Sequence, residues 1–415
     1  MQDKDSTKST FDQLFLPLLS KKFQQLLKQK GIDKYVKKLS AIRFMELIAH
    51  AQLKQQRGLR DISNSVNCDN LSRAIGLDSI SASQLSRKLR ELPTEVLQWV
   101  FDDVKMEVGK KLGFNAISQQ LGRLHLIDST TISLCLTRFS WAKFRETKAG
   151  IKIHLTLKFH EQGVLPERIT ITPARPSDKS QMDALVVEEK DALNVFDRGY
   201  VDYKKFDEYC QNGIRFVTRL KDNAITEVQE ERPLDPQGLI KKEQIVYLGQ
   251  EGINKMKHPL RLVETEDTRG NKVTIITNDF RLAAEEISNI YRYRWQIELF
   301  FKWLKQHLKV KHFYGTSEQA VKNQVFIAFI TYCLLVLLQR QAGHNGPLLD
   351  IKRLLCTCLY DTFENFLKKL HRKSRRSSKG RRKVNHEAVY QETVRQVMAG
   401  ETEHLDDLTY DPVIL

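Results

Sequence analysis

The sequence lacks the features that mark secreted, zinc-binding or membrane proteins. Its six cysteines are scattered, and no Cys-x-x-Cys pair recurs at zinc-site spacing, which indicates reduced thiols. No His-Glu-x-x-His motif occurs, and the N-terminal residues MQDKDSTKSTF are not a secretory signal. The longest apolar run, VFIAFITYCLLVLL at 325–338, is shorter than the roughly 20 residues that span a bilayer. We therefore expect a buried helix there and a cytoplasmic protein without a membrane partner.

Acidic residues are fewer than basic residues. There are 51 Asp and Glu residues against 67 Lys and Arg, which gives a formal net charge of +16 and a pI of about 9.4. Such a surplus attracts polyanions, of which nucleic acid is the commonest, although the charge could serve solubility alone. A chain of 415 residues suggests two to three domains, each able to bury its own core.

Residues 1–115 have the pattern of an all-helical domain. Apolar residues recur every three or four positions in FDQLFLPLLSKKFQQLLKQ and in SAIRFMELIAHAQL. Three shorter helical patterns follow, LRDISNSV, NLSRAIGL and SASQLSRKLREL, and Ser81 or Ser83 could cap the last of them. Short helices that end in a basic one are compatible with a helix-turn-helix unit that binds DNA ends, and equally with a small bundle that binds nothing.

Beyond residue 120 the pattern changes to strands. LHLID ends at Asp128, IKIHLTLKF alternates apolar and polar residues, and ERITITPA continues the alternation. We expect a helix at 179–192, the strand LNVF at 193–196, a helix near 202–211 and the strand IRFVTRL. This alternation of strands and helices predicts an α/β sheet with helices packed on it.

A β-rich insertion is expected next, because QIVYLGQ, LRLVETED and KVTIITND are strand patterns and TRGN between the last two predicts a hairpin turn. Near the C-terminus, the basic run HRKSRRSSKGRRK at 371–383 would neutralise phosphates or merely solubilise the chain. The expected parts are the helical domain 1–115, a first core part 120–222, the insertion 223–283, a second core part 284–345 and a basic helical or flexible tail 346–415.

The most informative stretch is YRYRWQIELFFKWLKQHLK, which contains no Gly or Pro and predicts one long helix from Tyr291. At about 100° per residue, Tyr291, Arg294, Glu298, Lys302 and Lys305 share one sector of a helix that is otherwise largely apolar and therefore buried. Buried charge is costly unless it is paired or bound to a ligand. Glu298 could pair with Arg294 and Lys302 in an ordinary ion-pair ladder, or it could hold a metal ion while the other side chains hold phosphates.

Asp128 and Asp197 favour the metal. Each follows a short apolar segment that should be a core strand, and each precedes a small or turn residue (DST, DRG). A single Asp in such a place is usually a helix cap or a turn former. Three carboxylates on different elements, however, are enough to hold Mg²⁺, and two such ions about 4 Å apart can clamp the attacking and leaving oxygens of a phosphodiester.

Together these residues resemble a known family. The segment Tyr291–Lys305 reads Y-x2-R-x3-E-x6-K, which resembles the signature around the catalytic glutamate of DDE-type insertion-sequence transposases, specifically the insertion-sequence-four family. IDSTT around Asp128 and FDRGY around Asp197 resemble the blocks that hold the two catalytic aspartates of that family. The gaps of 69 and 101 residues between the three acids suit the family. The first 110 residues also resemble the helical domain often found ahead of such cores.

The resemblance implies a transposase with an RNase H-like catalytic core that cuts and joins DNA at terminal inverted repeats. It also implies cut-and-paste movement by a homodimer on double-stranded DNA. Asp128, Asp197 and Glu298 would be both the catalytic residues and the metal ligands. They would hold two Mg²⁺ ions, with Mn²⁺ as a substitute. A bacterial cytoplasmic location at the nucleoid follows from the same resemblance.

The DNA-binding residues follow partly from the resemblance. Tyr291, Arg294 and Lys305 match the DNA-contacting positions of the signature, and Lys302 sits one turn along the helix. Arg198 flanks the second aspartate and is a further candidate. More basic residues gather around the first strands, where they could bind DNA or be ordinary surface charge: Lys143, Arg145, Lys148 and Lys152.

Two other functions stay open at this point. A catalytically silent transposase-derived protein would bind DNA without cutting it. An RNase H-like nuclease would cut DNA but would give no strand-transfer product. The presence of all three acids argues against the silent protein.

Overall fold

The computed structural model describes residues 8–112, 123–160, 163–234, 238–266 and 270–372, together with 388, 391–393 and 395–396. Contacts between residues divide the chain into two compact units. The helical unit comprises Met1–Asn115, Cys135–Ala142 and Phe300–Leu415, and the sheet unit comprises Ala116–Leu134 and Lys143–Leu299. Most of the basic run at 371–383 lies outside the described residues.

The N-terminal part of the helical unit consists of short helices, as the spacing of apolar residues predicts. Ser81 accepts a hydrogen bond from the backbone of Gln84 and is the N-cap of α6, which confirms one of the two expected caps. In chain order the elements are α1 (Thr10–Phe15), η1 (Leu16–Leu19), α2 (Lys21–Gln29), α3 (Ala41–Leu53), α4 (Leu59–Ser65), α5 (Asp69–Ile75), α6 (Ala82–Glu91) and α7 (Thr94–Lys111).

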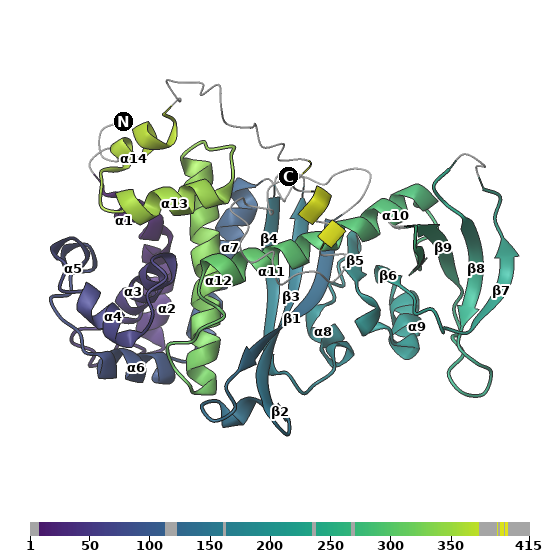
Figure 1. Cartoon of the computed structure of the whole chain (residues 1–415), viewed down its shortest axis with the longest axis horizontal. Coiled ribbons are helices and arrows are strands. Elements are labelled where there is room, and N and C mark those ends of the chain that lie inside the picture. Colours follow the sequence, from purple (N-terminus) through teal and green to yellow (C-terminus); the bar gives the residue numbers. More distant parts are fainter. Residues whose placement is uncertain are drawn as a thin grey trace. The chain divides into compact units, whose positions relative to one another are not determined.

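The helix α12 (Glu318–Gln341) is the centre of this unit, and it contacts α1, α3, α6 and α7 (Figure 1). By length and composition it could cross a membrane, but 94% of its most apolar window is buried inside the protein. The expectation of a buried helix at 325–338 is therefore confirmed. Its polar groups are paired, since the Asn323 amide donates to Leu89 O at 2.9 Å and to Leu92 O at 2.7 Å. The remaining elements of the unit are η2 (Ser140–Ala142), α13 (Leu348–Cys358) and α14 (Phe363–Leu370).

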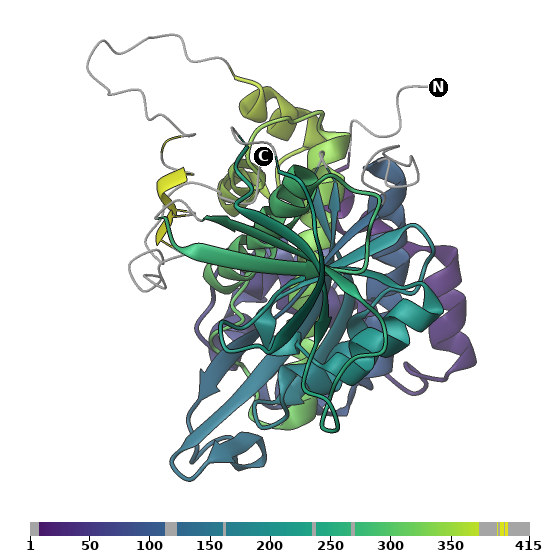
Figure 2. The ribbon, with the colours of Figure 1, turned by 90° about the vertical axis from the view of Figure 1, so that its right-hand side faces the viewer.

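The sheet unit is built on one mixed sheet, which has ten strands within the described residues. The strand order is β2-β3-β1-β5-β6-β10-β9-β8-β7, and β4 pairs with β3. Figure 2 shows these strands fanned by the twist that L-amino acids impose on a sheet. The strands are β1 (Arg123–Leu134), β2 (Lys143–Arg145), β3 (Lys148–His160), β4 (Gly163–Pro173), β5 (Ala192–Phe196), β6 (Arg215–Arg219), β7 (Thr226–Glu231), β8 (Lys242–Leu248), β9 (Leu260–Glu266) and β10 (Lys272–Thr277).

The strands expected as an insertion continue this same sheet. Antiparallel pairing joins Thr277 of β10 to Val217 of β6, and β9, β8 and β7 follow outward. Strand β7 was not expected from the sequence, because its residues TEVQEE are all exposed and show no apolar alternation. The β9–β10 hairpin was expected, but part of its turn, 267–269, lies outside the described residues.

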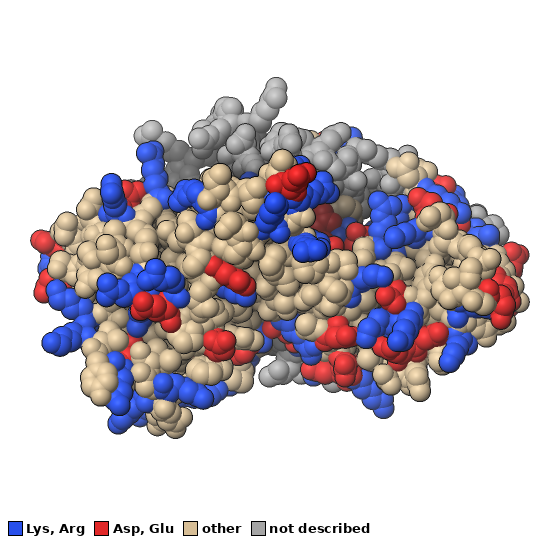
Figure 3. Space-filling model, turned by 90° about the horizontal axis from the view of Figure 1, so that it is seen from below, with Lys and Arg blue, Asp and Glu red and all other residues tan. Residues whose placement is uncertain are grey.

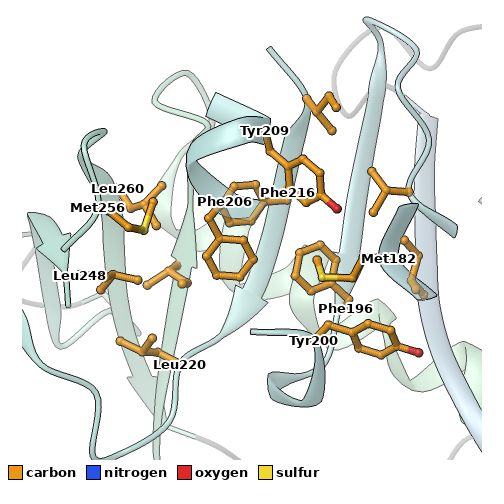
Figure 4. Close-up of a cluster of buried hydrophobic side chains, with 14 of the residues drawn as sticks. Met182, Phe196, Tyr200, Phe206, Tyr209, Phe216, Leu220, Leu248, Met256 and Leu260 are labelled. Atoms are coloured by element: carbon orange, nitrogen blue, oxygen red, sulfur yellow. The ribbon is translucent and has the colours of Figure 1, made fainter. Parts of the chain in front are cut away.

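An aromatic core covers one face of the sheet (Figure 4). The ring of Phe216 on β6 stacks on Phe206 of α9 (Tyr203–Asn212) at 4.6 Å between centroids and on Phe196 of β5 at 5.9 Å. The expected helix near 202–211 is present as α9 (Tyr203–Asn212), with Asp202 as its N-cap. The expected helix at 179–192 is much shorter, because only η3 (Asp178–Gln181) and α8 (Met182–Leu185) form and extended backbone follows. The 3-10 helix η4 (Arg198–Tyr200) lies between β5 and α9.

The expected single helix from Tyr291 is divided at Arg294. Helix α10 (Ala284–Tyr293) ends there and α11 (Trp295–His307) begins. Two hydrogen bonds across three residues mark the junction, from Arg294 N to Tyr291 O and from Ile297 N to Arg294 O, each 3.2 Å long. This tighter 3-10-type turn interrupts the regular α-helical hydrogen bonding between the two helices.

Candidate active site

Asp128 lies on β1 where one of its two neighbouring strands ends. Parallel pairing with β5 runs from Arg123 opposite Ala192 to Ile127 opposite Phe196. The antiparallel partner β3 continues along β1 to Leu134. The expectation that the strand stops at Asp128 is therefore wrong, because β3 supports it for six more residues. What ends before Asp128 is the pairing of β1 with β5.

Asp197 is the residue that directly follows β5. Its backbone is extended, with φ −79° and ψ 164°, and the 3-10 helix η4 begins after it. The expected turn after Asp197 is thus present. Because Ile127 and Phe196 are register partners, Asp128 and Asp197 are the next pair along two adjacent parallel strands. Neighbouring strands lie about 4.8 Å apart, so the sheet itself brings these two carboxylates together.

Glu298 enters the same place from the first turn of α11, and a buried arginine joins it to β1. The Arg294 guanidinium donates to Asp128 Oδ2 at 3.2 Å and pairs with Glu298 Oε1 at 2.7 Å. Arg294 is only 6% exposed. The rings of Trp295 and Tyr291 lie 4.8 and 5.8 Å from its guanidinium carbon and fix its orientation. Glu298 therefore points towards the strand carboxylate and not into solvent on an outer surface.

Burial makes these charges costly and raises the pKa of both acids. The pKa of Asp128 rises to about 7, chiefly through burial, while Arg294 opposes the rise and the nearby Glu298 and Asp197 carboxylates add to it. The pKa of Glu298 also rises through burial, again against Arg294 and with Asp197 contributing. Each carboxylate responds to the charge of its neighbours, as closely grouped acids do. The cluster has an excess of negative charge that a cation would relieve.

The donor set fits a hard divalent cation, since Mg²⁺ and Mn²⁺ prefer carboxylate oxygens. Among the residues that the structure describes, no three His, Cys, Asp or Glu side chains are already arranged around one ion position. The Arg294 guanidinium instead contacts both Asp128 and Glu298 and neutralises them as a bound cation would. The residues are compatible with a metal site once this guanidinium moves aside.

A second polar network lies behind the two aspartates, on the face of the sheet opposite to Asp128. The Ser129 hydroxyl donates to Asp178 Oδ1 at 2.7 Å, and the Lys152 ammonium pairs with the same oxygen at 3.0 Å. Asp178 Oδ2 is 3.9 Å from the position that a Cβ on Gly199 would occupy. Burial lowers the pKa of neighbouring His154 to about 4, against the pull of Asp178. Asp178 thus binds the residue after Asp128 and lies near the turn that follows Asp197.

The remaining candidates are distributed along the chain as follows. Tyr291 is 8% exposed, and burial raises the pKa of its hydroxyl. Arg198 is exposed in η4, beside Asp197. Lys302 and Lys305 are half-buried on α11, in the part of that helix that belongs to the helical unit. Sequence reasoning missed Asp178, because an Asp between Ser and Lys in a turn carries no periodic or motif signal.

Two known families match parts of this chain. A family described as "Transposase DDE domain" matches residues 120–334. The chain therefore belongs to the DDE transposase family, as the resemblance of its acidic blocks predicts, and it is an enzyme of that class. A second family, described as "Domain of unknown function (DUF4372)", matches residues 6–72.

Curated relatives place the chain among insertion-sequence transposases. It is 34% identical over 245 residues to transposase y4zB of Sinorhizobium fredii, covering 57% of this chain and 67% of that protein. It is 29% identical over 268 residues to the transposase for insertion sequence element IS5377 of Geobacillus stearothermophilus, covering 63% of this chain and 68% of that protein. Among solved structures, a piggyBac transposase synaptic complex with hairpin DNA matches with a TM-score of 0.42 and 12% identity, over 94% of this chain and 84% of that one.

Proposed function

We propose that this transposase cuts DNA at the terminal inverted repeats of its insertion sequence and joins the ends to a new site, with Asp128, Asp197 and Glu298 as the catalytic carboxylates. The observation that carries the proposal is the shared cation, since Asp128 and Glu298 bind one guanidinium at 3.2 and 2.7 Å. Asp197 is the strand neighbour of Asp128 and contributes to the raised pKa of both other acids. These contacts support a site formed by three acids, from β1, the end of β5 and α11.

An RNase H-like core is part of the proposal. The order β4-β3-β1-β5-β6 supports it, because β3 is antiparallel to its neighbours β4 and β1, whereas β5 and β6 run parallel to β1. This is the strand arrangement of that fold class. We keep the domain limits that the sequence predicts. In this proposal the core is interrupted by the insertion at 223–283 and is flanked by the helical domain 1–115 and the tail 346–415.

Each carboxylate has a distinct position in the proposed site. Asp128 and Asp197, side by side at the sheet edge, would share one Mg²⁺ or Mn²⁺ ion, and Glu298 with Asp128 would hold a second. Bound divalent ions would supply charge neutralisation of the phosphodiester and activation of the attacking water or 3′-hydroxyl. The protein's own contribution is to hold the three acids in place.

Arg294 would change partners during the reaction. With the carboxylates neutralised by cations, its guanidinium would leave Asp128 and bind a DNA phosphate, for which its planar fork of donors is well suited. Tyr291, Arg198, Lys302 and Lys305 would hold further phosphates around the reacting bond. From the family resemblance we also propose that the protein acts as a homodimer on double-stranded DNA and moves its element by cut-and-paste transposition. Its proposed location is the cytoplasm, at the nucleoid.

The test is cleavage of a labelled duplex taken from the DNA that flanks the coding sequence, in Mg²⁺ and in EDTA. Wild-type protein should cut only with the metal and should give strand-transfer products. Asp128→Ala and Glu298→Ala should abolish cleavage but keep DNA binding. The matched control is Asp183→Ala, an exposed aspartate of the same unit paired with Lys205, which should cut normally.

The outcomes separate the alternative functions. Cleavage by Asp128→Ala at the normal rate would refute the assignment of the acids. Cutting without joined products would favour a nuclease. Binding without cutting by wild-type protein in Mg²⁺ or Mn²⁺ would favour a silent DNA-binding protein.

A further inference from the structure

The loop between α2 and α3 presents an aromatic ring to solvent from a strained backbone. Tyr35 is 87% exposed, and its φ is 68°. The hydrogen bond from Val36 N to Asp33 O, 3.0 Å long, closes a turn in which Tyr35 is the third residue. A positive φ at this position is normally taken by Gly or Asn, because a side chain with a Cβ is crowded there. Strain of this kind tends to be kept where it serves a function.

Five lysines lie on either side of Tyr35 in the sequence KQKGIDKYVKK, residues 28–38, which we name the lysine loop. All five side chains are exposed, and within the described part of the chain none forms an ion pair with a carboxylate. The ammonium of Lys34 lies 5.1 Å from the centre of the Tyr35 ring, so a cation and an aromatic face are presented together. Figure 3 shows Lys and Arg side chains spread over the visible face, with Asp and Glu side chains among them.

The lysine loop is anchored at both ends, so its shape is not that of a loose connection. Its one acid, Asp33, accepts the Ala41 N–H at 3.0 Å and pairs with Lys88 of α6 at 3.0 Å. Arg43 of α3 donates to Lys38 O at 3.0 Å. The acid is therefore used to hold the loop on α3 and α6, and it does not neutralise the five lysines.

We propose that the lysine loop is a DNA-contacting element of this transposase. Lysine ammonium groups neutralise backbone phosphates, and an exposed ring stacks on a base or inserts between base steps. DNA matches both the lysines and the exposed ring, because it carries anionic phosphates and planar bases that can stack. The loop lies within residues 6–72, the match to a domain of unknown function, and it would give that domain a role in holding DNA.

This surface differs from the one that the sequence suggests. The basic helix α6 was the candidate for recognition, but Lys88 on that helix is engaged by Asp33 of the loop. The helix therefore supports the loop and contributes less free charge of its own. The inference rests on the proposed function for its ligand, because it assumes that DNA is the substrate.

The sharpest variant is Tyr35→Gly, since it separates folding from binding. Glycine adopts a positive φ without crowding, so the variant should be at least as stable to heat as the wild type. Loss of the ring should weaken binding to the flanking-DNA duplex about tenfold, as expected for one stacking contact. Binding is measured by fluorescence anisotropy in EDTA, with full-length protein, so that cleavage plays no part. Ile253→Ala, which removes an exposed apolar side chain from the sheet unit, is the control and should change neither property.

Two adjacent lysine pairs provide a matched test of the charges. Lys37→Ala with Lys38→Ala should reduce the slope of log affinity against log salt by about 1.8, the value expected for two lost phosphate contacts. Lys110→Ala with Lys111→Ala removes the same charge from exposed positions at the end of α7 and should leave the slope unchanged. Equal effects of the two pairs, or unchanged affinity of Tyr35→Gly, would overturn the proposal.

An anionic lipid surface is the alternative ligand of the lysine loop. Binding of the protein and its loop variants to vesicles containing phosphatidylserine tests this alternative. If the loop variants lose vesicle binding and keep DNA binding, the proposal is wrong. Failure of the lysine loop is also distinguishable from failure of the catalytic proposal. Normal DNA binding by the loop variants, with cleavage still lost in Asp128→Ala, would overturn the loop alone. A wild-type protein that never cuts, but whose DNA binding depends on the loop, would overturn only the catalytic assignment.

Discussion

The acidic site and the lysine loop differ in whether their charged groups are paired within the protein. In the site, Arg294 is buried and lies within 3.2 Å of one carboxylate and 2.7 Å of another. In the loop, five lysines are exposed and have no carboxylate partner among the described residues. A buried charge must be matched inside the protein, whereas an exposed one can wait for a ligand. The site therefore carries its own substitute cation, and the loop is left open for an external anion.

The largest expected effect is on the chemistry of the site. Glu298→Gln keeps the shape of the side chain but removes a negative charge, so cation binding and catalysis should both suffer. We expect cleavage to fall by about a thousandfold or more, while DNA affinity, which depends on basic residues, stays near the wild-type value. Single-turnover cleavage and anisotropy measure the two quantities. Glu285→Gln, at an exposed position of α10, is the control, and an equal loss in that variant would contradict the assignment.

Arg294→Ala should be the most destabilising of these changes. It leaves Asp128 and Glu298 buried without their shared partner, which costs about 3–5 kcal/mol for a broken buried pair. Mg²⁺ or Mn²⁺ should restore part of this stability, because a cation can take the place of the guanidinium. Urea unfolding with and without metal tests this. The control is Arg292→Ala, an exposed arginine two positions away, and equal metal effects on both variants would count against a shared cation position.

Glu46 sharpens the comparison, because it is a buried acid outside the site. Burial raises its pKa to about 7, with Arg43 opposing the rise. The unfolded carboxyl ionises near 4.5, so the stability that the protonated folded form provides is lost as pH rises from 4.5 to about 7. Above pH 7, ionisation of Glu46 therefore lowers the free energy of unfolding by about 3 kcal/mol relative to its value below pH 4.5. Glu46→Gln should therefore stabilise the protein at pH 8 more than at pH 5.

Urea unfolding at the two pH values measures this difference. Glu95→Gln, on the exposed side of α7, should show no pH-dependent gain. An equal gain at both pH values for Glu46→Gln would mean that the Glu46 carboxyl does not titrate as described.

The smallest of these effects concerns the network behind the sheet. Asp178→Asn removes the charge that holds Lys152 and weakens the hold on Ser129, so Asp128 should be less well fixed. We expect cleavage and Mn²⁺ affinity to fall by about tenfold, as is typical when a residue that orients a ligand is lost. A drop in cleavage without any change in Mn²⁺ affinity would show that Asp178 does not act through the carboxylates. Asp183→Asn, exposed and nearby in the chain, is the control.

Much of the site could be predicted from the sequence, because its parts are locally encoded. Short apolar runs before Asp128 and Asp197 predict core strands, and two adjacent parallel strands then place both acids at one edge. The buried helix at 325–338 follows from its composition alone. The break at Arg294 could not be foreseen, because a three-residue hydrogen bond at a helix junction leaves the spacing of apolar residues almost unchanged.

Long-range contacts account for most of what the sequence did not reveal. Asp178 reaches Ser129 across 49 positions of the chain, and no local pattern records such a contact. Strand β1 continues past Asp128 because β3 supports it, and β7 forms at the sheet edge from polar residues without an apolar face. The lysine loop is visible in the sequence as charge, but its strained tyrosine and its anchoring by Asp33 need the fold.

The most direct test of the central claim is a Mn²⁺ titration followed by electron paramagnetic resonance of the free ion. Wild-type protein should bind Mn²⁺, and Asp128→Asn, Asp197→Asn and Glu298→Gln should each weaken that binding strongly, because in the proposed site the three carboxylates would hold the same ions. Asp183→Asn should bind as the wild type does. Wild-type affinity in any one of the three site variants would show that its carboxylate does not belong to the metal site.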